Sequence, residues 1–545
     1  MALMNDCCNS QFDLFRSTER MYIDKSLLIK DILERNENGR FLYTRPRRFG
    51  KSMNRSMLDC FFNIKYKDNN WFDGLKISEY HRFDVHKNRY PVINLDLMQV
   101  MGSDLADFKS QIRALIRDQY LLFPFLTEDE RIQASDRQFI SSVIRGDCNV
   151  DWIYTAIPTL MRVLHHYYGE PVVVLMDEYD HGLTSSASNK DLDEMTKVLS
   201  VFLGSIMKTS PDAKFVYVTG VAQLCKAGLF SGVNNLYVDS ITDSDSGDRF
   251  GFTEDEVLSV LENIGRTDDI ESVRRYYDGY LIGGHHIYNP FSIIKYASEQ
   301  KLDPYWIGTS NTNPMETILN RMNTETVGPI FTLINGGSIQ IAVDDSFNYN
   351  ALLDPDFKGL ISLMVMTGYL TAKPSDDGEY DVYIPNEEVR QSVRRIMNRA
   401  VPLSNSNVYG FVQAFMDMDR GRMESRLADI LAFHSYFDLK DESSYAIILM
   451  QVLSSLITRY DVRAQVESGN GRVDMMLRPV KDGLPSVVIE VKKVGKEKKL
   501  GKALDEALEQ IHDRRYTMGM NGRVILMGFA FWGKVPSIRI EETVV

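Results

Sequence analysis

The chain has 545 residues, of which 44% are hydrophobic and 25% are charged. A single hydrophobic core rarely grows beyond about 250–300 residues, so this length predicts about two to four domains. The composition is that of a globular protein and excludes a largely disordered chain. The formal net charge of -13 disfavours a protein that is basic over its whole surface, although an acidic protein can carry a local basic site.

Cysteine usage and hydropathy indicate the cellular compartment. The five cysteines are Cys7, Cys8, Cys60, Cys148 and Cys225, an odd number without a C-x-x-C pair. This pattern disfavours a disulfide framework or a zinc ribbon and favours a reducing compartment. No apolar run approaches the roughly 18 residues of a membrane-spanning helix, and the first residues lack a basic stretch followed by a hydrophobic one. We therefore expect a cytoplasmic protein without a membrane partner.

The first half of the chain alternates short apolar segments with longer amphipathic ones. The predicted strands are residues 40–44, 91–96, 171–176 and 214–219. Such short apolar runs suit strands that are buried on both faces of a parallel sheet, and the segments between them are long enough for helical crossovers. Residues 1–285 are therefore predicted to form a three-layer α/β domain.

The middle region, residues 286–405, has a different pattern. A helix is predicted at 357–368, strands at 369–372 and 380–385, and another helix from Glu387 onward. A helix, a hairpin and a further helix are typical of part of a winged-helix module. A helical linker domain with one hairpin would give the same pattern, so both interpretations stay open.

The last region, residues 406–545, returns to an α/β pattern. Its predicted elements are a helix at 445–458, strands at 473–478 and 486–492, a helix at 501–515 and a strand at 524–532. The strand at 524–532 is apolar over most of its length, which favours a buried position.

A basic loop with one glycine follows the first predicted strand. Its sequence, R-P-R-R-F-G-K-S at 45–52, matches the end of the P-loop pattern G-x-x-x-x-G-K-[ST], with Arg45 in place of the first glycine. In this pattern Gly50 lets the backbone approach phosphates, Lys51 reaches the β and γ phosphates, and Ser52 ligates Mg²⁺. A basic loop before an ordinary helix would contain the same residues. The candidate nucleotide-binding residues of the loop are Arg47, Arg48, Phe49, Gly50, Lys51 and Ser52.

A second pattern lies at the end of the third predicted strand, where V-V-V-L-M is followed by Asp177 and Glu178. An apolar strand that ends in Asp-Glu is the Walker B pattern, in which Asp177 would hold Mg²⁺ and Glu178 would polarise the attacking water. The predicted strand at 91–96 lies between the two patterns, as in P-loop ATPases with an inserted strand. Thr219, at the tip of the next strand, is a candidate sensor of the γ-phosphate.

Seven motifs occur in order within about residues 10–320. They are Y-I-D-K at 22–25, R-P-R-R-F-G-K-S at 45–52, V-V-V-L-M-D-E-Y-D at 172–180, F-S-G-V-N-N-L at 230–236, G-F-T-E-D-E-V at 251–257, Y-D-G-Y at 277–280 and Y-N-P-F-S at 288–292. Together they resemble the AAA-ATPase-like family of bacterial and other microbial proteins. The family's loop also resembles R-P-R-R-F-G-K-S, so Arg45 departs from the general P-loop and not from this group. The resemblance implies ATP binding at Lys51, Ser52 and Asp177.

The C-terminal region carries a candidate metal site. G-R-V-D at 471–474 is followed by V-V-I-E-V-K at 487–492. Residues two apart in a strand share a face, so Glu490 and Lys492 point the same way, and a partner strand would bring Asp474 alongside Glu490. Two such carboxylates can hold Mg²⁺ against a phosphodiester, and Lys492 can orient water or stabilise negative charge. The arrangement is similar to the PD-(D/E)XK nucleases, whose domain such ATPases usually carry.

Further residues near this pattern are weaker candidates. Glu467 or Glu442 would supply another acid, and Gln510 matches a polar position in related nucleases. Residues 491–504 contain six lysines and one glutamate, a charge balance suited to a phosphate backbone. A solvated cross-strand salt bridge and a solvated helix entry would give the same residues.

Three functions are compatible with these patterns. The first is an ATP-binding and ATP-hydrolysing protein coupled to a metal-dependent nuclease that acts on nucleic acid, on DNA more than on RNA. The alternative is an ATP-dependent switch or scaffold whose nuclease-like domain is inactive and serves for docking. A structural protein that binds no nucleotide would require both Walker patterns to be coincidental. A homo-oligomer stays open, with Arg249 and Arg275 as candidate arginine fingers. The histidines at 165–166 and 285–286 lack further ligands at metal spacing and are expected to be structural or exposed.

Overall fold

The computed structural model divides the chain into two compact units, one of residues 1–312 with 340–389 and one of residues 313–339 with 390–545. The residues that the structure describes are 10–18, 20–36, 39–147, 150–185, 190–208, 210–223, 233, 235–306, 329, 332–333, 336–344, 356–400, 405–432, 439, 441–453, 456, 459–480 and 483–545. Within them, no helix is long and apolar enough to cross a membrane. The boundaries after residues 285 and 405 stay predictions.

Some sequence features lie outside the described residues. These include Cys7, Cys8, Cys148 and Cys225, whereas Cys60 is described and buried. Most of the 230–236 motif is also outside them, as are four residues near the end of the helix predicted at 445–458.

A parallel sheet of five strands forms the centre of the first unit. Its strands are β1 (Arg40–Thr44), β2 (Val92–Asp96), β3 (Val172–Asp177), β4 (Ala213–Gly220) and β5 (Leu236–Asp239), in the order β2-β3-β4-β1-β5. Every residue of β1, β3 and β4 is buried, as expected for a parallel sheet covered on both faces. The four predicted strands are confirmed. The strand β5 was not among the predicted strands, because it is short and only half-buried over most of its length.

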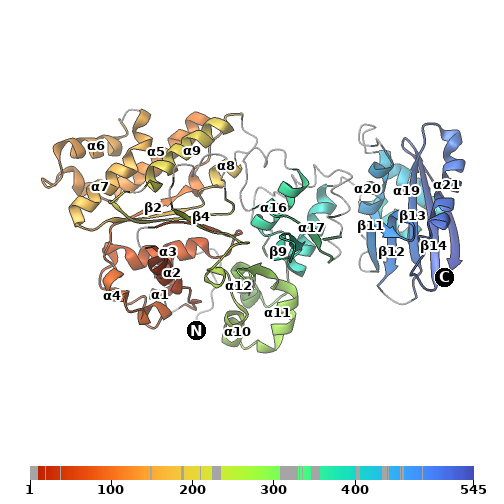
Figure 1. Cartoon of the computed structure of the whole chain (residues 1–545), viewed down its shortest axis with the longest axis horizontal. Coiled ribbons are helices and arrows are strands. Elements are labelled where there is room, and N and C mark those ends of the chain that lie inside the picture. The colour runs from red at the N-terminus through yellow and green to blue at the C-terminus, as the bar shows by residue number, and fades with distance from the viewer. Residues whose placement is uncertain are drawn as a thin grey trace. The chain divides into compact units, whose positions relative to one another are not determined.

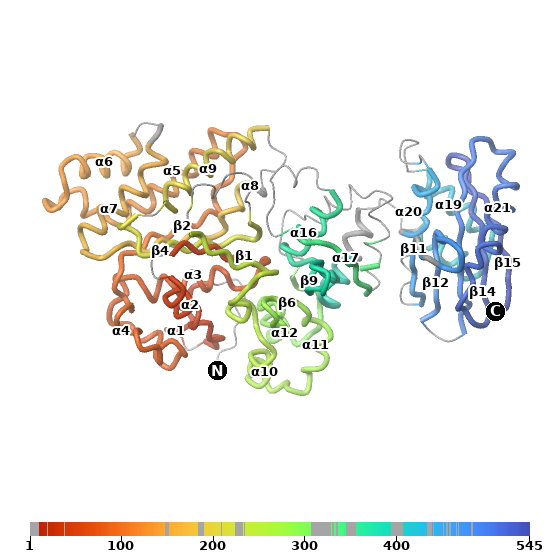
Figure 2. Tube along the Cα trace, viewed as in Figure 1, coloured from red at the N-terminus to blue at the C-terminus, as the bar shows by residue number. Residues whose placement is uncertain are grey.

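Helices cover both faces of this sheet (Figure 1). One face carries α1 (Phe12–Ser17), α2 (Leu27–Asn36), α3 (Lys51–Phe62) and α4 (Phe83–His86), and the other carries α5 (Leu105–Leu121), α6 (Ala134–Arg145), α7 (Ala156–Tyr168) and α9 (Leu192–Met207). The short helix α8 (His181–Ser185) follows β3. The predicted three-layer α/β arrangement is therefore confirmed, and the Cα trace shows the same layers (Figure 2).

Beyond the sheet, the first unit continues with a smaller helical region. It contains α10 (Glu254–Asn263), α11 (Ile270–Tyr277), the hairpin β6 (Tyr280–Ile282) with β7 (His285–Ile287), and α12 (Pro290–Glu299). The predicted helix, hairpin and helix of the middle region follow as α16 (Phe357–Thr367), β9 (Thr371–Pro374) with β10 (Tyr380–Tyr383), and α17 (Glu387–Ala400). A further strand, β8 (Ile339–Ile341), gives the sheet order β8-β10-β9.

A buried carboxylate anchors the start of α17. Glu388 is fully buried, and its carboxylate accepts hydrogen bonds of 2.8 Å from the Ser292 hydroxyl and of 2.9 Å from the backbone N–H groups of Tyr305 and Trp306. Burial raises the pKa of Glu388 to about 7, although these bonds favour the charged form. The Trp306 indole in turn donates to the carbonyl oxygen of Arg47 at 3.2 Å. The start of α17 is thus linked to the basic loop.

The second unit is built on a mixed five-stranded sheet. Its helices are α18 (Asn405–Met416), α19 (Arg420–Ala432), α20 (Glu442–Leu453) and α21 (Leu500–Asp513), and its strands are β11 (Tyr460–Ser468), β12 (Gly471–Pro479), β13 (Ser486–Lys493), β14 (Arg523–Trp532) and β15 (Val535–Val544). Neighbouring strands follow chain order and pair antiparallel, except that β13 and β14 are parallel. The helix α21 provides the crossover that a parallel pair needs. The predicted strands β12, β13 and β14 are confirmed.

Candidate functional site

The basic loop joins β1 to α3 through a left-handed turn. Gly50 precedes the first helical residue with φ of 87°, a region that favours glycine because it has no Cβ. Lys51 and Ser52 therefore begin α3, where the first backbone N–H groups have no partner within the helix. Such a helix start attracts anions, because its N–H groups and the helix dipole both favour negative charge.

The Lys51 side chain is 3% exposed and lies across the loop. Its Nζ donates to the carbonyl oxygens of Arg45 at 3.1 Å and Pro46 at 3.2 Å, and lies 3.3 Å from Glu178 Oε1. The lysine thus connects the loop to the end of β3. These contacts hold its ammonium group at the edge of the sheet where β1 and β3 end.

Acidic residues at the end of β3 face the same edge. Asp177 is almost fully buried, and its Oδ1 accepts a hydrogen bond from the Thr219 hydroxyl at the end of β4. The contact follows from the strand order, because β3 and β4 are parallel neighbours and their ends lie side by side. Glu178 has φ of 52°, an unusual conformation for a residue other than glycine, asparagine or aspartate. The structure therefore brings together Lys51, Asp177, Glu178 and Thr219.

A cavity of about 450 Å³ opens at this edge. One part of its lining is the basic loop, Arg47, Arg48, Phe49, Gly50, Lys51 and Ser52, together with the charged residues Arg55, Asp96, Asp177 and Glu178. The other part is apolar and includes Phe15, Tyr22, Ile23, Phe252, Phe291 and Ile294. Arg48 lies over the ring of Phe291, with its guanidinium carbon 5.0 Å from the ring centre. A ligand with an anionic end and a flat apolar end would match both parts.

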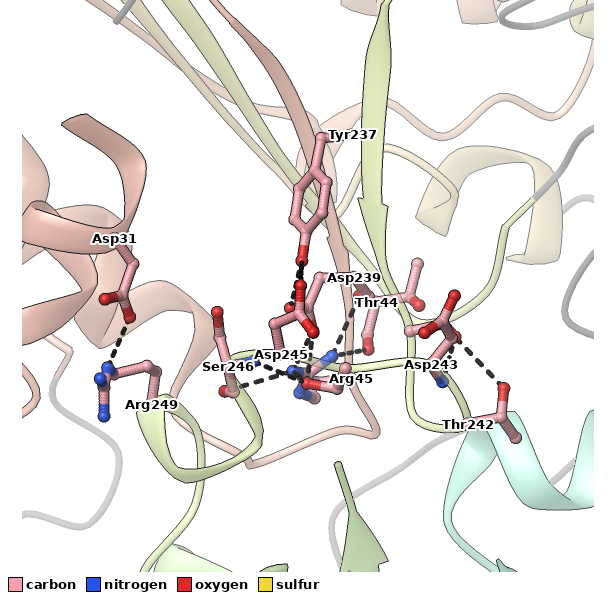
Figure 3. Close-up of polar contacts among 12 residues, drawn as sticks. Asp31, Thr44, Arg45, Tyr237, Asp239, Thr242, Asp243, Asp245, Ser246 and Arg249 are labelled. Atoms are coloured by element: carbon pink, nitrogen blue, oxygen red, sulfur yellow. Dashed lines mark hydrogen bonds and ion pairs between the residues drawn. The ribbon is translucent and has the colours of Figure 1, made fainter. Parts of the chain in front are cut away.

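Arg45, which replaces the first glycine of the general P-loop, points away from this cavity. Its side chain is fully buried and forms an ion pair with Asp239 at the end of β5. It also donates to the carbonyl oxygen of Thr44 at 2.8 Å (Figure 3). The hydroxyl of Ser244 accepts a further hydrogen bond of 2.8 Å from Arg45, and the guanidinium lies over the Phe250 ring. Arg45 therefore joins the ends of β1 and β5 and is not among the cavity-lining residues.

Asp180, in the same acidic motif as Asp177, was not singled out in the sequence. It is buried, and its Oδ2 accepts from the backbone N–H groups of Val221 at 2.9 Å and Ala222 at 3.0 Å. Burial and the nearby Glu178 carboxylate raise the pKa of Asp180 to about 6. The second aspartate of the D-E-Y-D sequence at 177–180 could have pointed to this residue.

The two candidate arginine fingers have different surroundings. Arg249 lines the cavity and pairs with Asp31, whose Oδ2 lies 2.6 Å from its Nε (Figure 3). It also pairs with Asp248. Lys25 of the Y-I-D-K motif lies beside it and pairs with Glu256 at 2.6 Å. Arg275 is exposed on α11 and does not line the cavity. The sequence did not identify Lys25 as a lining residue.

A second cluster lies on the sheet of the C-terminal unit. Asp474 on β12 accepts from the backbone N–H of Val491 at 2.8 Å, which brings it beside Glu490 on β13. Glu490 Oε1 accepts from Lys492 Nζ at 3.0 Å and from the amide of Gln510 on α21. The Gln510 amide oxygen accepts from Lys492 at 2.7 Å. Side chains from two strands and one helix therefore converge.

The electrostatics of this cluster favour a cation. The Glu490 side chain is 3% exposed, and its Oε2 has no hydrogen-bond partner among the described residues. Burial and the neighbouring Asp474 carboxylate raise the pKa of Glu490 to about 7, against the lowering effect of Lys492. Burial lowers the pKa of Lys492, but the Glu490 carboxylate outweighs burial and the pKa is raised. An unpartnered buried oxygen beside a second carboxylate fits a divalent cation.

The weaker candidates near this cluster differ in position. Glu442, at the start of α20, accepts from the backbone N–H of Lys493 at 3.1 Å and lies near the cluster. Glu467 is opposite Arg472 in the β11–β12 register, but its side chain is outside the described residues. Among the described residues, no group of three or more acidic, histidine or cysteine side chains could hold a metal. The cluster therefore offers the two carboxylates of Asp474 and Glu490.

Comparison with known proteins assigns both regions. The family model described as "Predicted AAA-ATPase" matches residues 8–230, and the model described as "PD-(D/E)XK nuclease superfamily" matches residues 440–536. An uncharacterized protein in the vnfD 5′ region of Azotobacter chroococcum mcd 1 is 26% identical over 386 residues, which cover 69% of this chain and 66% of that protein. The match thus spans just under two thirds of the relative's length.

Two solved structures from Aeropyrum pernix also match. They are described as the ORC2 protein in ADPNP-ADP complexes and the ORC1 protein in complex with DNA, with 12% and 10% identity and TM-scores of 0.25 and 0.23. Each match covers 69% of this chain, and they cover 94% and 93% of those chains. Because these TM-scores are low, the description of the fold is based on the strand order of this chain and not on these two structures. Residues 8–230 are therefore similar to the family described as "Predicted AAA-ATPase", and residues 440–536 are similar to the PD-(D/E)XK nuclease superfamily.

Proposed function

We propose that the N-terminal unit binds and hydrolyses ATP in the cavity between the basic loop and the ends of β2 and β3. The observation that carries this proposal is the meeting of Lys51, the start of α3 and the carboxylates of Asp177 and Glu178 at one edge of the sheet. The 450 Å³ volume lies within the usual range for small-molecule sites. Its apolar part is suited to the flat base, and its basic part to the phosphates.

The roles of the residues follow from their chemistry. Lys51 and the backbone N–H groups after Gly50 bind the phosphates, while Arg47 and Arg48 add positive charge. Ser52 and Asp177 hold Mg²⁺, which neutralises phosphate charge when bound. Glu178 accepts a proton from the attacking water, and the bond between the γ-phosphorus and the bridging oxygen breaks. Thr219 reports the state of this site through its hydrogen bond to Asp177.

For the C-terminal unit we propose metal-dependent cleavage of nucleic acid, of DNA more than of RNA. The buried and unpartnered Glu490 Oε2 beside Asp474 supports this function, because folding alone would not require a buried carboxylate oxygen without a partner next to a second carboxylate. Asp474 and Glu490 hold the divalent cation, which polarises the scissile phosphate when bound. Lys492 orients the water, and Gln510 fixes Lys492 relative to Glu490. Water adds to phosphorus as the bond to the leaving sugar oxygen breaks, and the proton that the water loses is balanced by protonation of that oxygen.

The decisive experiment measures cleavage of plasmid DNA, single-stranded DNA and RNA with Mg²⁺ or Mn²⁺, with and without ATP. Wild type is compared with Glu490→Ala and Lys492→Ala. Lys502→Ala serves as the matched control, because Lys502 belongs to the same lysine-rich segment but pairs with Glu506 in an exposed position. We expect metal-dependent cleavage in wild type and control, its loss in both site variants, and a change in rate with ATP.

The alternative is an ATP-dependent switch or scaffold whose nuclease-like region serves for docking. It predicts that wild type and all variants are equally inert on every substrate while ATP still binds. Lys51→Ala separates the two regions, because it weakens ATP binding without changing the cluster around Glu490, and the ATP concentration is held below the dissociation constant of the variant. Cleavage that persists in Lys51→Ala and no longer responds to ATP would support the coupled function.

A further inference from the structure

Arg55 is a cation inside the nucleotide cavity that the general P-loop pattern does not require. It lies on α3 one helical turn after Ser52, so both side chains share a face of the helix. It lines the same cavity as Lys51 and Asp177, and its side chain is 16% exposed. The arginine is therefore close to the atoms that would hold Mg²⁺.

Its guanidinium group contacts polar side chains on two strands. The Nη1 atom donates to Asn94 Oδ1 in the middle of β2, and Nη2 lies 3.7 Å from Asp96 Oδ2 at the end of β2. The Nε atom lies 3.4 Å from Asp177 Oδ2 at the end of β3. The β2–β3 register pairs Asp96 with Asp177, which brings both carboxylates within reach of one guanidinium.

The contact with Asp177 differs from the others. Arg55 Nε is buried and forms no hydrogen bond among the described residues, so its attraction to Asp177 is electrostatic only. Asp177 Oδ1 is already engaged by the Thr219 hydroxyl. Arg55 thus occupies the side of Asp177 that a cation would approach, and its charge is permanent because arginine does not lose its proton in proteins.

We infer that Arg55 is a positioning residue that holds Asp177 Oδ2 and sets the Mg²⁺ concentration that nucleotide binding requires. This inference rests on the proposed ATP site. A fixed positive charge a few ångströms from the metal repels it, and the repulsion is weakly screened because Asp177 is buried and Arg55 is only 16% exposed. The arginine therefore raises the Mg²⁺ requirement while it keeps the buried carboxylate paired in the nucleotide-free protein.

The test is a Mg²⁺ titration of fluorescent ATP-analogue binding to the full chain, with N-methylanthraniloyl-ATP as the probe. We expect Arg55→Met, which keeps length and removes charge, to lower the Mg²⁺ concentration at half-maximal binding by about 3- to 10-fold. Arg55→Lys, which keeps the charge, is expected to stay within about twofold of wild type. Arg131→Met is the control, because it removes an arginine from an exposed pair with Asp129 outside the cavity.

The outcomes separate the inference from the proposed function. If wild type does not bind the analogue at any Mg²⁺ concentration, the ATP site itself is wrong. If wild type and Arg55→Met both bind it with the same Mg²⁺ requirement, or the variant needs more, the role of Arg55 is wrong. If Arg55→Met does not fold, Asp96→Asn is tested in its place. Asp96 and Asp177 both attract the Arg55 guanidinium, so loss of the Asp96 charge should strengthen the ion pair between Arg55 and Asp177. Asp96→Asn is then expected to raise the requirement, and an unchanged value overturns the inference.

Discussion

The ion pair between Arg45 and Asp239 offers a sharp test of how the first unit is held together. Both side chains are fully buried, so Arg45→Met leaves a carboxylate inside the protein without its cation. Breaking such a pair typically costs about 3–5 kcal/mol. Asp239 keeps hydrogen bonds from Ser244 at 2.7 Å and Tyr237 at 3.1 Å, so we expect about 3 kcal/mol, near the lower limit. The apparent melting temperature should fall by at least about 5 °C.

Thermal and urea unfolding followed by tryptophan fluorescence measure this loss, because Trp71, Trp152 and Trp306 all belong to the first unit. Arg45→Gly is a second informative variant. It restores the glycine of the general P-loop, yet it should destabilise the unit at least as much as Arg45→Met and should not improve ATP binding.

The double variant Arg45→Met with Asp239→Leu provides the control. Replacement of both charges by apolar side chains removes the unpaired carboxylate and should recover most of the lost stability. The reasoning would be refuted if Arg45→Met cost less than about 1 kcal/mol, or if the double variant were less stable by the sum of both single losses.

Four further outcomes are expected. Lys51→Ala should weaken ATP binding by about 10- to 100-fold in calorimetry, because charged hydrogen bonds to phosphate are lost, and unchanged affinity would contradict its role. Gly50→Ala should destabilise the protein by about 1–2 kcal/mol in urea unfolding through backbone strain alone, since a Cβ at φ of 87° would meet no atom within 4 Å. The raised pKa of Glu388 means that the native state binds the proton more tightly than the unfolded state between pH 4.5 and 7, so stability falls as pH rises through this window. Glu388→Gln should remove this loss of stability, which amounts to at most about 3 kcal/mol, and melting curves recorded between pH 4.5 and 7 would show it. If the stability of the variant fell with pH as steeply as that of wild type, Glu388 would be excluded as the source. Glu490→Gln should abolish metal-dependent cleavage yet melt no lower than wild type at pH 8, because burial disfavours the charge on this residue, whereas a large drop in melting temperature would attribute the loss to unfolding.

Local patterns in the sequence were sufficient for much of the fold. Four of the strands in the N-terminal sheet are short apolar runs, and apolar periodicity depends only on neighbouring residues. The P-loop pattern at Gly50, Lys51 and Ser52 and the acidic end of β3 were recognisable for the same reason, because both patterns are defined by residue type and spacing. On β13 the period of two placed Glu490 and Lys492 on one face, where the structure joins them by a hydrogen bond.

Strands without a strong local pattern were missed. The strand β5 has a half-buried pattern, and β15, at the sheet edge, contains several exposed residues. Neither presents the continuous apolar run or strict alternation that identifies a strand from sequence alone. Pairing with a neighbouring strand, rather than local composition, determines their conformation.

The tertiary structure alone decided which distant residues meet. In the sequence Arg45 belongs to the basic phosphate-loop pattern and lies 194 positions from Asp239. The two residues form a buried ion pair only because β1 and β5 are neighbours in the sheet. Arg55 reads as one polar residue on a helix, and the β2–β3 register places it beside Asp177. A sequence determines periodicity and residue chemistry locally, whereas contacts between remote residues depend on strand order, which follows from the packing of the whole core.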